Sequence, residues 1–400
     1  MADAMDQPAA QTPATQVPAA QVPAPQASAD VQAGVIAPSA PSGGVSASTS
    51  TGSGGDAGQR ESFNKLELAI VMSHFDIGII EEIKEFPRGS RKAPKLYIVT
   101  DEGKFLLKRR AAGRADPYKV AFTHAIQLEL AAKQFPLPHL IGTKKTNNSM
   151  LQWGGGVYEL FEFIPGSGYS HSLEATYDGG RVLGLFHKLL ADFATEHEPT
   201  AGSYHKAPAV ERGLVGIPNN LSRLPGVDAA NIEQTCQFLL KAYRNAAQGC
   251  EAQGLSTWPS QIAHADWHPG NMLFREDRVV AVIDYDSARL LPRIVDMANG
   301  ALQFSIIGGD ENVAKWPDYV DESRFKRFCR AYDGTLQLSQ AEIAIIPHLM
   351  AEALIAEAVF PIAATGNFGR MDGAAFLDMV RRKVTWLQAN HDRLVEMVEA

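Results

Sequence analysis

Between residues 264 and 286 the chain alternates apolar runs with side chains that move protons or bind cations. HADWHPGN, at 264–271, places Asp266 five residues before Asn271, and the apolar run AVID ends in Asp284. We expect short strands around a polar loop, with Asp266 and Asn271 aimed to one side and Asp284 at a nearby strand end. A fold that accommodates this segment must therefore bring one loop and one strand end to a common site.

These three side chains suit phosphoryl transfer. A carboxylate such as Asp266 can accept the proton of a substrate hydroxyl, and the oxygens of Asn271 and Asp284 are of the kind that Mg²⁺ prefers. Phosphoryl transfer needs positioning and charge neutralisation rather than covalent help from the protein. The alternative is a turn rich in Asp and Asn, whose side chains bond to local backbone. That alternative explains one of these residues, but not three at this spacing.

The first sixty residues differ from the rest of the chain. Residues 1–60 hold no Leu and no aromatic residue and consist almost throughout of small residues, Pro and Gln. Such a segment cannot bury enough apolar surface to offset the entropy of ordering it, so we predict a disordered tail. The tail lacks the basic start and the apolar core of a signal peptide, and Asp3 and Asp6 precede any basic residue, unlike a transit peptide.

Composition excludes several classes of function. A formal net charge of −8 argues against nucleic acid as the main partner, and no run approaches the apolar length of a membrane span. The cysteines Cys236, Cys250 and Cys329 are too few and too scattered for a disulfide framework or a zinc site. We therefore expect a cytoplasmic protein, and the sequence leaves its oligomeric state open.

The order of predicted elements divides the rest of the chain into two lobes. Hydrophobic periodicity predicts a short helix, three strands, a helix and two further strands, followed after residue 175 by a region that is mostly helical. We predict an α+β protein with a small antiparallel-sheet N-lobe at 61–165, a helical C-lobe at 166–400 and a ligand cleft at their junction. The predicted strands are 77–86, 93–100, 104–110, 137–143 and 156–164, and the predicted helices are 66–75, 118–135, 179–193, 228–249, 320–332, 340–359 and 373–398.

The motif H-x-D-x-x-x-x-N followed by a strand-end I-D resembles the catalytic signature of the aminoglycoside phosphotransferase and choline kinase superfamily. KFLLKRR at 104–110 resembles the strand whose lysine holds nucleotide phosphates, and FEFIPG at 161–166 resembles the hinge. Neither the D-F-G nor the A-P-E of protein kinases follows. The likeness spans about residues 65–390, is nearest to homoserine kinase type II-like and spore-coat-kinase-like proteins, and implies a two-lobed protein-kinase-like fold.

The resemblance implies roles for the residues of the catalytic segment. Asp266 would orient and deprotonate the acceptor hydroxyl. Asn271 and Asp284 would bind a Mg²⁺ ion that bridges the ATP phosphates. Asp296, in PRIVDMA, would brace the loop as a structural residue.

The resemblance also implies how the N-lobe would bind ATP. Lys108 would contact the α- and β-phosphates and would be held by a carboxylate of the following helix, for which Glu129 is the candidate. The backbone of Glu162 and Phe163 would hydrogen-bond adenine. Strand alternation places Lys108 and Arg110 on one face and Arg109 on the other.

Several alternatives stay open. His264 is expected to brace the loop. His268 either braces it or contacts phosphate or substrate, and Asp286 is either a surface or secondary acid or a metal ligand. The expected function is ATP-dependent phosphorylation of a small hydroxyl compound: homoserine-like, an amino alcohol, a sugar or an aminoglycoside. A silent nucleotide-binding scaffold and a protein kinase are the other hypotheses.

The loop at 87–95 lacks the Asn that homoserine kinase-like sequences carry there, and its Arg and Lys residues could cover the phosphates instead. The helical lobe is expected to supply the acceptor site, including 196–222 and the helices of 295–370, and we expect 201–220 to be a polar loop.

Overall fold

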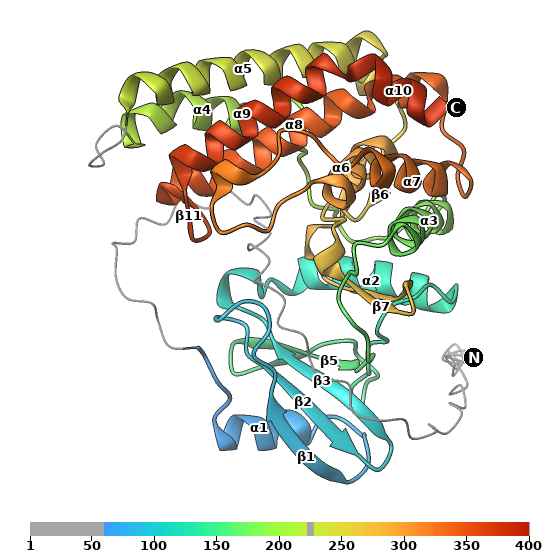
Figure 1. Cartoon of the computed structure of the whole chain (residues 1–400). Coiled ribbons are helices and arrows are strands. Elements are labelled where there is room, and N and C mark those ends of the chain that lie inside the picture. The colour runs from blue at the N-terminus through green and yellow to red at the C-terminus, as the bar shows by residue number, and fades with distance from the viewer. Residues whose placement is uncertain (1–59, 222–227, 400) are drawn as a thin grey trace, which may run out of the picture. The chain divides into compact units, whose positions relative to one another are not determined.

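The computed structural model describes residues 60–221 and 228–399, all of which belong to one compact unit. The predicted disordered tail lies outside the described residues, apart from Arg60. Figure 1 shows a sheet-based part followed by a helical part, which is the order of elements that periodicity predicted.

The first part is a five-stranded antiparallel sheet in the order β1-β2-β3-β5-β4, with the helix α1 beside it (Figure 1). Three of the predicted strands lie within a few residues of β1, β2 and β3, and a fourth matches β5. The elements are α1 (Lys65–Met72), β1 (Ile80–Glu85), β2 (Lys95–Thr100), β3 (Gly103–Arg109), β4 (Leu151–Trp153) and β5 (Gly156–Glu162).

One predicted strand is wrong and one observed strand was missed. Residues 137–143 form only an isolated bridge, between Leu140 and Phe161, and Pro136 and Pro138 remove two of the backbone donors that a strand needs. The missed strand is β4, which lies in the turn-rich segment NNSMLQWGGG and pairs with β5 in a tight hairpin.

Alternation along β3 separates the two faces of the sheet. Phe105 and Leu107 belong to the hydrophobic core of the sheet, to which Val71 of α1 also belongs. Leu106 and Lys108 therefore lie on the opposite face.

Most of the remaining elements are helices, of which α2 lies in the chain between β3 and β4 and the others follow β5. They are α2 (Pro117–Ala132), α3 (Leu173–Leu189), α4 (Pro208–Leu221), α5 (Ala229–Ala252), α6 (Arg293–Ser305), α7 (Glu322–Asp333), α8 (Gln340–Thr365), α9 (Gly373–Ala389) and α10 (His391–Glu399). Short strands separate them: β6 (Gln261–Ala263), β7 (Met272–Arg275), β8 (Arg278–Val282), β9 (Arg289–Leu291), β10 (Asn367–Phe368) and β11 (Met371–Asp372).

Two helical predictions need correction. The segment around 201–220 was expected to be a polar loop, yet α4 occupies its second half, because Val210, Leu214, Ile217 and Leu221 recur at helical spacing and are buried. The single helix predicted over 373–398 is two helices, α9 and α10, separated at Asn390.

Helix α2 lies between the sheet and the helices that follow (Figure 1). Its residues Phe122, Ile126 and Leu130 belong to the hydrophobic core of the helical part and not to that of the sheet. Val120 of α2 packs with Val157 of β5 in a separate small cluster, so α2 contacts both parts.

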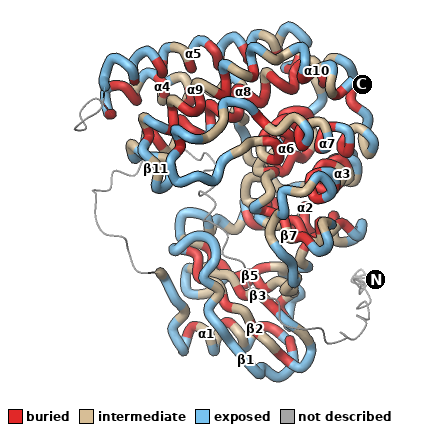
Figure 2. The backbone as a smooth tube through the Cα atoms, viewed as in Figure 1, coloured by how far each residue is buried: buried red, intermediate tan, exposed pale blue. Residues whose placement is uncertain are grey.

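Helix α8 is long and apolar enough to cross a membrane by length and composition. However, 78% of its most apolar window is buried inside the protein (Figure 2). This burial is typical of a core helix. The high hydropathy of α8 follows, because a buried helix has no face that must be polar.

Candidate active site

The loop after β6 brings Asp266 and Asn271 together. The Nδ2 group of Asn271 donates to Oδ2 of Asp266 at 3.0 Å and to its backbone oxygen at 3.1 Å. This leaves Oδ1 of Asn271 available as a ligand. Ala265, just before Asp266, has a φ of 59°, a left-handed conformation that is uncommon for a residue with a side chain.

A buried carboxylate on α6 holds this loop. Asp296 accepts the backbone N–H of His264 at 2.7 Å and that of Ala265 at 2.9 Å. The ring of His187, on α3, lies 3.2 Å from the same carboxylate. The predicted bracing role of Asp296 is therefore observed, and His187 is a part of the brace that the sequence did not reveal.

The hairpin of β7 and β8 places Asp284 beside Asn271. Met272 pairs with Val282, and the N–H of Ile283 donates to the backbone oxygen of Asn271 at 2.9 Å. Asp284 follows with a φ of 65° and is exposed. Among residues 60–221 and 228–399, no hydrogen bond or ion pair engages its carboxylate. Asp284 and Asn271 thus present free oxygens of the type that suits Mg²⁺.

Lys108 faces the same site from β3. Its Nζ lies 3.6 Å from Oε2 of Glu159 and 4.0 Å from Oδ2 of Asp286. Arg109 points the other way and pairs with Glu67 at 2.6 Å. The predicted division of these basic side chains between two faces is confirmed.

The structure corrects the expected carboxylate partner of Lys108. Glu129 does not pair with Lys108; it lies 2.8 Å from Lys133, one helical turn further along α2, and its side chain is 34% exposed. The carboxylate beside Lys108 is instead Glu159, its cross-strand neighbour on β5. The register of α2 explains the error, because the helix turns His124 rather than Glu129 toward the sheet.

Glu159 and Asp286 form a buried charge network with Lys108 and Arg110. Arg110 donates to both oxygens of Glu159 at 2.8 Å and to Asp286 at 2.8 Å. Burial acts against the charge of Glu159, yet Lys108 and Arg110 hold the pKa of its carboxyl well below the usual range. Burial likewise opposes the charge of Lys108, but Glu159 and Asp286 raise its pKa. The two cations and two carboxylates are therefore all ionised.

The N–H groups of the two predicted hinge residues make hydrogen bonds within the protein. The N–H of Glu162 donates to the backbone oxygen of His139 at 2.9 Å, and that of Phe163 donates to Lys104 at 2.8 Å. Both donors are thus engaged within the protein. Ile164 has the first N–H after β5 with no hydrogen-bond partner among the residues that the structure describes.

Two basic residues near Asp266 and Lys108 complete the site. Lys95, on β2, is the cross-strand neighbour of Lys108 and donates to the backbone oxygen of Arg88 at 3.3 Å. Burial, aided by Lys108, lowers the pKa of Lys95. Nε2 of His268 lies 3.6 Å from Asp266. Lys95 was not among the predicted site residues, although its place opposite Lys108 on a neighbouring strand could have indicated it.

An acid of α8 lies within electrostatic range of Asp266. Glu357 is exposed, and both of its oxygens accept from the Nε2 group of Gln303, at 2.8 and 2.7 Å. The protein around the carboxyl displaces water and, with the nearby carboxylate of Asp266, raises the pKa of Glu357 to about 7. No sequence motif marks Glu357, because it is one acid in a long apolar helix.

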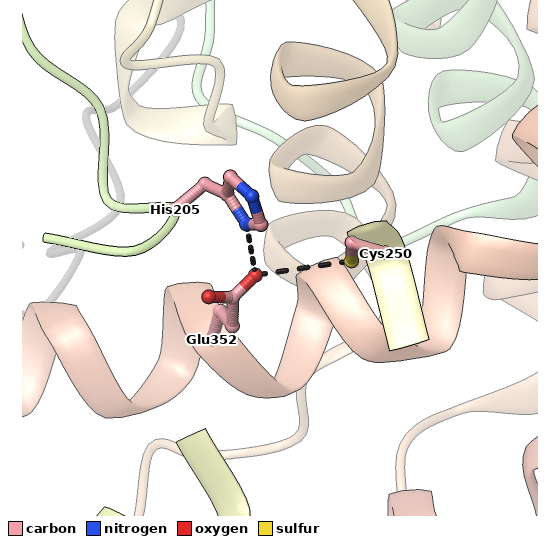
Figure 3. A group of neighbouring side chains, drawn as sticks. All are labelled: His205, Cys250 and Glu352. Atoms are coloured by element: carbon pink, nitrogen blue, oxygen red, sulfur yellow. Dashed lines mark hydrogen bonds and ion pairs between the residues drawn. The ribbon is translucent and has the colours of Figure 1, made fainter. Parts of the chain in front are cut away.

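A second group of titratable side chains lies in the helical part (Figure 3). Nδ1 of His205 is 2.7 Å from Glu352 on α8, and Cys250 on α5 lies 3.9 Å from the same carboxylate. The other nitrogen of His205 is 3.0 Å from Glu251. These donor types could hold a metal ion, but the groups already satisfy one another, with a carboxylate against each ring nitrogen. We assign them as an ion-pair cluster.

A family model matches this chain over residues 82–337, and its description is the phosphotransferase enzyme family. The matched range contains most of β1, all of β2 to β9, and the residues of the candidate active site except Glu357. No curated protein matches the chain by sequence.

Solved structures share the fold at low sequence identity. An aminoglycoside phosphotransferase from Alicyclobacillus acidocaldarius is 17% identical, with a TM-score of 0.60 over 86% of this chain and 99% of that one. An amicoumacin kinase in complex with AMP-PNP and Ca²⁺ is 10% identical, with a TM-score of 0.59 over 83% and 94%. A microcompartment-associated aminopropanol kinase is 14% identical, with a TM-score of 0.58 over 82% and 98%. These likenesses confirm the predicted two-lobed, kinase-like α+β fold.

Proposed function

The chain belongs to the phosphotransferase enzyme family, and we propose that it transfers the γ-phosphate of Mg²⁺-bound ATP to a hydroxyl group of a small molecule. The observation that carries the proposal is the convergence of three groups. Asn271 bonds the carboxylate of Asp266, and the β7–β8 register sets Asp284 beside Asn271. The proposed proton acceptor and two oxygen ligands therefore come from the loop that leads into the β7–β8 hairpin and from the segment that leaves it.

The N-lobe side of the site suits the nucleotide. Lys108 and Lys95 are neighbouring cations on one face of the sheet and would contact the phosphates, while the free N–H of Ile164 would bond adenine in place of the engaged donors of Glu162 and Phe163. The amicoumacin kinase, which shares the fold, holds AMP-PNP and Ca²⁺.

The C-lobe side would supply the chemistry. Asn271 and Asp284 would hold Mg²⁺, which neutralises phosphate charge when bound. Asp266 would orient the acceptor hydroxyl and take its proton, and the hydrogen bond from Asn271 fixes the carboxylate for that task. The Asp296 brace holds the loop that carries Asp266.

The acceptor we favour carries an amine beside its hydroxyl. Asp266 is close enough to Glu357 to raise the pKa of its carboxyl, and Glu357 is exposed. Two acids at one site favour a cation over a neutral sugar. We propose an amino alcohol or aminoglycoside rather than a plain sugar, acted on in the cytoplasm, where three buried free cysteines would stay reduced.

The test is consumption of Mg²⁺-ATP across a panel of hydroxyl compounds with and without amines. We expect phosphorylated product with amine-bearing acceptors, and an Asp266→Asn variant that binds ATP normally but loses turnover by roughly a hundredfold or more. ATP binding without product from any acceptor would favour a silent scaffold. Near-normal turnover in Asp266→Asn would show that Asp266 is not the base.

A further inference from the structure

Lys108 of β3 lies beside Glu159, an acid of the same sheet. Glu159 lies directly opposite Lys108 on β5, and its side chain is fully buried. We propose that Glu159 is the positioning residue for Lys108, and that His124 of α2 holds Glu159 in place. This inference rests on the proposed role of Lys108 in binding nucleotide phosphates.

The hydrogen bonds of Glu159 leave its carboxylate little freedom. One oxygen accepts from Arg110 at 2.8 Å and lies 2.7 Å from Nε2 of His124. The other accepts from Arg110 at 2.8 Å and lies 3.6 Å from Nζ of Lys108. A two-pronged arginine contact fixes both the position and the plane of a carboxylate. The carboxylate of Glu159 is thus held in place and attracts the flexible side chain of Lys108.

His124 connects this fixed point to α2. Its Nε2 faces Glu159, and its Nδ1 lies 2.8 Å from the hydroxyl of Ser149. The residues around His124 on α2, Phe122 and Ile126, are buried in the core of the helical part. A shift of α2 relative to the sheet would therefore move the carboxylate that holds Lys108.

No acid of α2 can take this role in the structure. Glu129 is the one acid between Pro117 and Ala132, and it is partly exposed and paired with Lys133. Asp286 is the other carboxylate near Lys108, at 4.0 Å, but it comes from the helical part and also bonds Arg110. Without Glu159, the acids that attract Lys108 would be Asp286 and Asp284, both from the segment after β8 and not from the sheet.

The experiment measures the affinity of the full-length protein for Mg²⁺–AMP-PNP by calorimetry, together with its melting temperature. We expect Glu159→Gln to weaken AMP-PNP binding by roughly ten- to a hundredfold, the size expected when a hydrogen-bonded charge is lost. His124→Leu should weaken binding in the same direction. His124→Gln, which keeps a donor toward Glu159, should restore much of the affinity.

Glu67→Gln is the matched control. Glu67 is also a buried acid of the sheet part, bonded to an arginine at 2.6 Å and to the hydroxyl of Tyr158 at 2.8 Å, but it lies on the face opposite Lys108. This variant should lower the melting temperature and leave AMP-PNP affinity unchanged.

The outcomes are distinct. If Glu159→Gln melts at a lower temperature but binds AMP-PNP like the wild type, Glu159 is only structural and the inference fails. If Glu159→Gln does not fold, the two His124 variants provide the test. Wild-type affinity for AMP-PNP in His124→Leu overturns the inference. Weak binding in His124→Leu that is restored in His124→Gln supports it. A wild-type protein that does not bind Mg²⁺–AMP-PNP would instead overturn the proposed function.

Discussion

At the scale of single residues, two left-handed positions frame the site. Ala265 and Asp284 have φ values of 59° and 65°, although neither is glycine. Such a conformation costs about 1–3 kcal/mol and persists only where the surroundings over-determine it. Asp296 holds the first position through two backbone hydrogen bonds, and the β7–β8 hairpin precedes the second. The geometry around Asp266 is therefore imposed by its surroundings.

Glu357 gives a prediction for pH dependence. Its pKa is raised to about 7, so the fraction that is a carboxylate increases as the pH rises from 6 to 8. If this carboxylate binds the amine of the acceptor, the KM for the acceptor falls over that range in the wild type. In Glu357→Gln we expect a KM raised about tenfold at pH 8 and little change between pH 6 and pH 8.

Steady-state kinetics with an amine-bearing acceptor checks this prediction, with the KM for ATP as the internal control. Equal pH profiles of acceptor KM in the wild type and in Glu357→Gln would mean that Glu357 does not contact the acceptor.

At the scale of elements, close packing of α3 against α7 depends on a glycine. A Cβ atom built on Gly180 of α3 would lie 2.3 Å from the backbone oxygen of Phe328 on α7. Backbone atoms cannot move aside as a flexible side chain does. The two helices approach this closely only because Gly180 has no side chain.

Gly180→Ala should therefore lower the free energy of unfolding by about 1–3 kcal/mol. Gly216, in α4, is the control, because a Cβ there would meet nothing within 4 Å. Gly216→Ala should be neutral or stabilise the protein by up to about 1 kcal/mol, since alanine favours the helix. Urea denaturation measures both; equal stability of the two variants would show that α3 and α7 can separate freely.

The cluster around His205 joins α5 to α8 (Figure 3). Burial opposes the charge of His205, but hydrogen bonds to Glu352 and Glu251 raise its pKa above 6.5. A raised pKa means that the stabilisation is complete below pH 6.5 and is lost as the pH rises through the folded-state value.

We therefore expect His205→Gln to flatten part of the pH dependence of stability. The free energy of unfolding should decrease more between pH 6 and pH 9 in the wild type than in the variant, by about 1.4 kcal/mol for each unit by which the pKa is raised. Denaturation series at several pH values test this. Parallel pH profiles would assign the dependence to other groups.

At the scale of the whole molecule, the sheet and the helices have separate hydrophobic cores. The charge network of Lys108, Arg110, Glu159 and Asp286 crosses between them, as does α2. A ligand that contacts both parts should therefore stabilise the entire molecule, because it adds a further connection between them.

Mg²⁺-ATP at a hundred times its Kd should stabilise the wild type by about 2.7 kcal/mol and raise its melting temperature. Asp284→Ala removes a proposed metal ligand, so this increase should be lost or strongly reduced. Thermal unfolding with Mg²⁺-ATP, and with EDTA and ATP as control, provides the measurement. An undiminished shift in Asp284→Ala would argue against the assignment of Asp284.

The sequence by itself determined the features that depend on neighbouring residues. Alternation predicted β2, β3 and β5 and the opposed faces of Lys108 and Arg109, and the spacing of HADWHPGN predicted the meeting of Asp266 and Asn271. Each of these follows from local periodicity or from a single loop. The family likewise follows from motifs that are short and contiguous.

Only the tertiary structure decided the partners that come from distant segments. Glu159, not Glu129, stands beside Lys108 because of the rotation of α2 and the register of β5. Glu357 reaches the site because α8 packs through the core, and the donors of Glu162 and Phe163 are taken by residues that pair across the sheet and its edge. These contacts depend on how whole helices and strands pack against one another and on the register of the strands. A local sequence pattern does not contain that information.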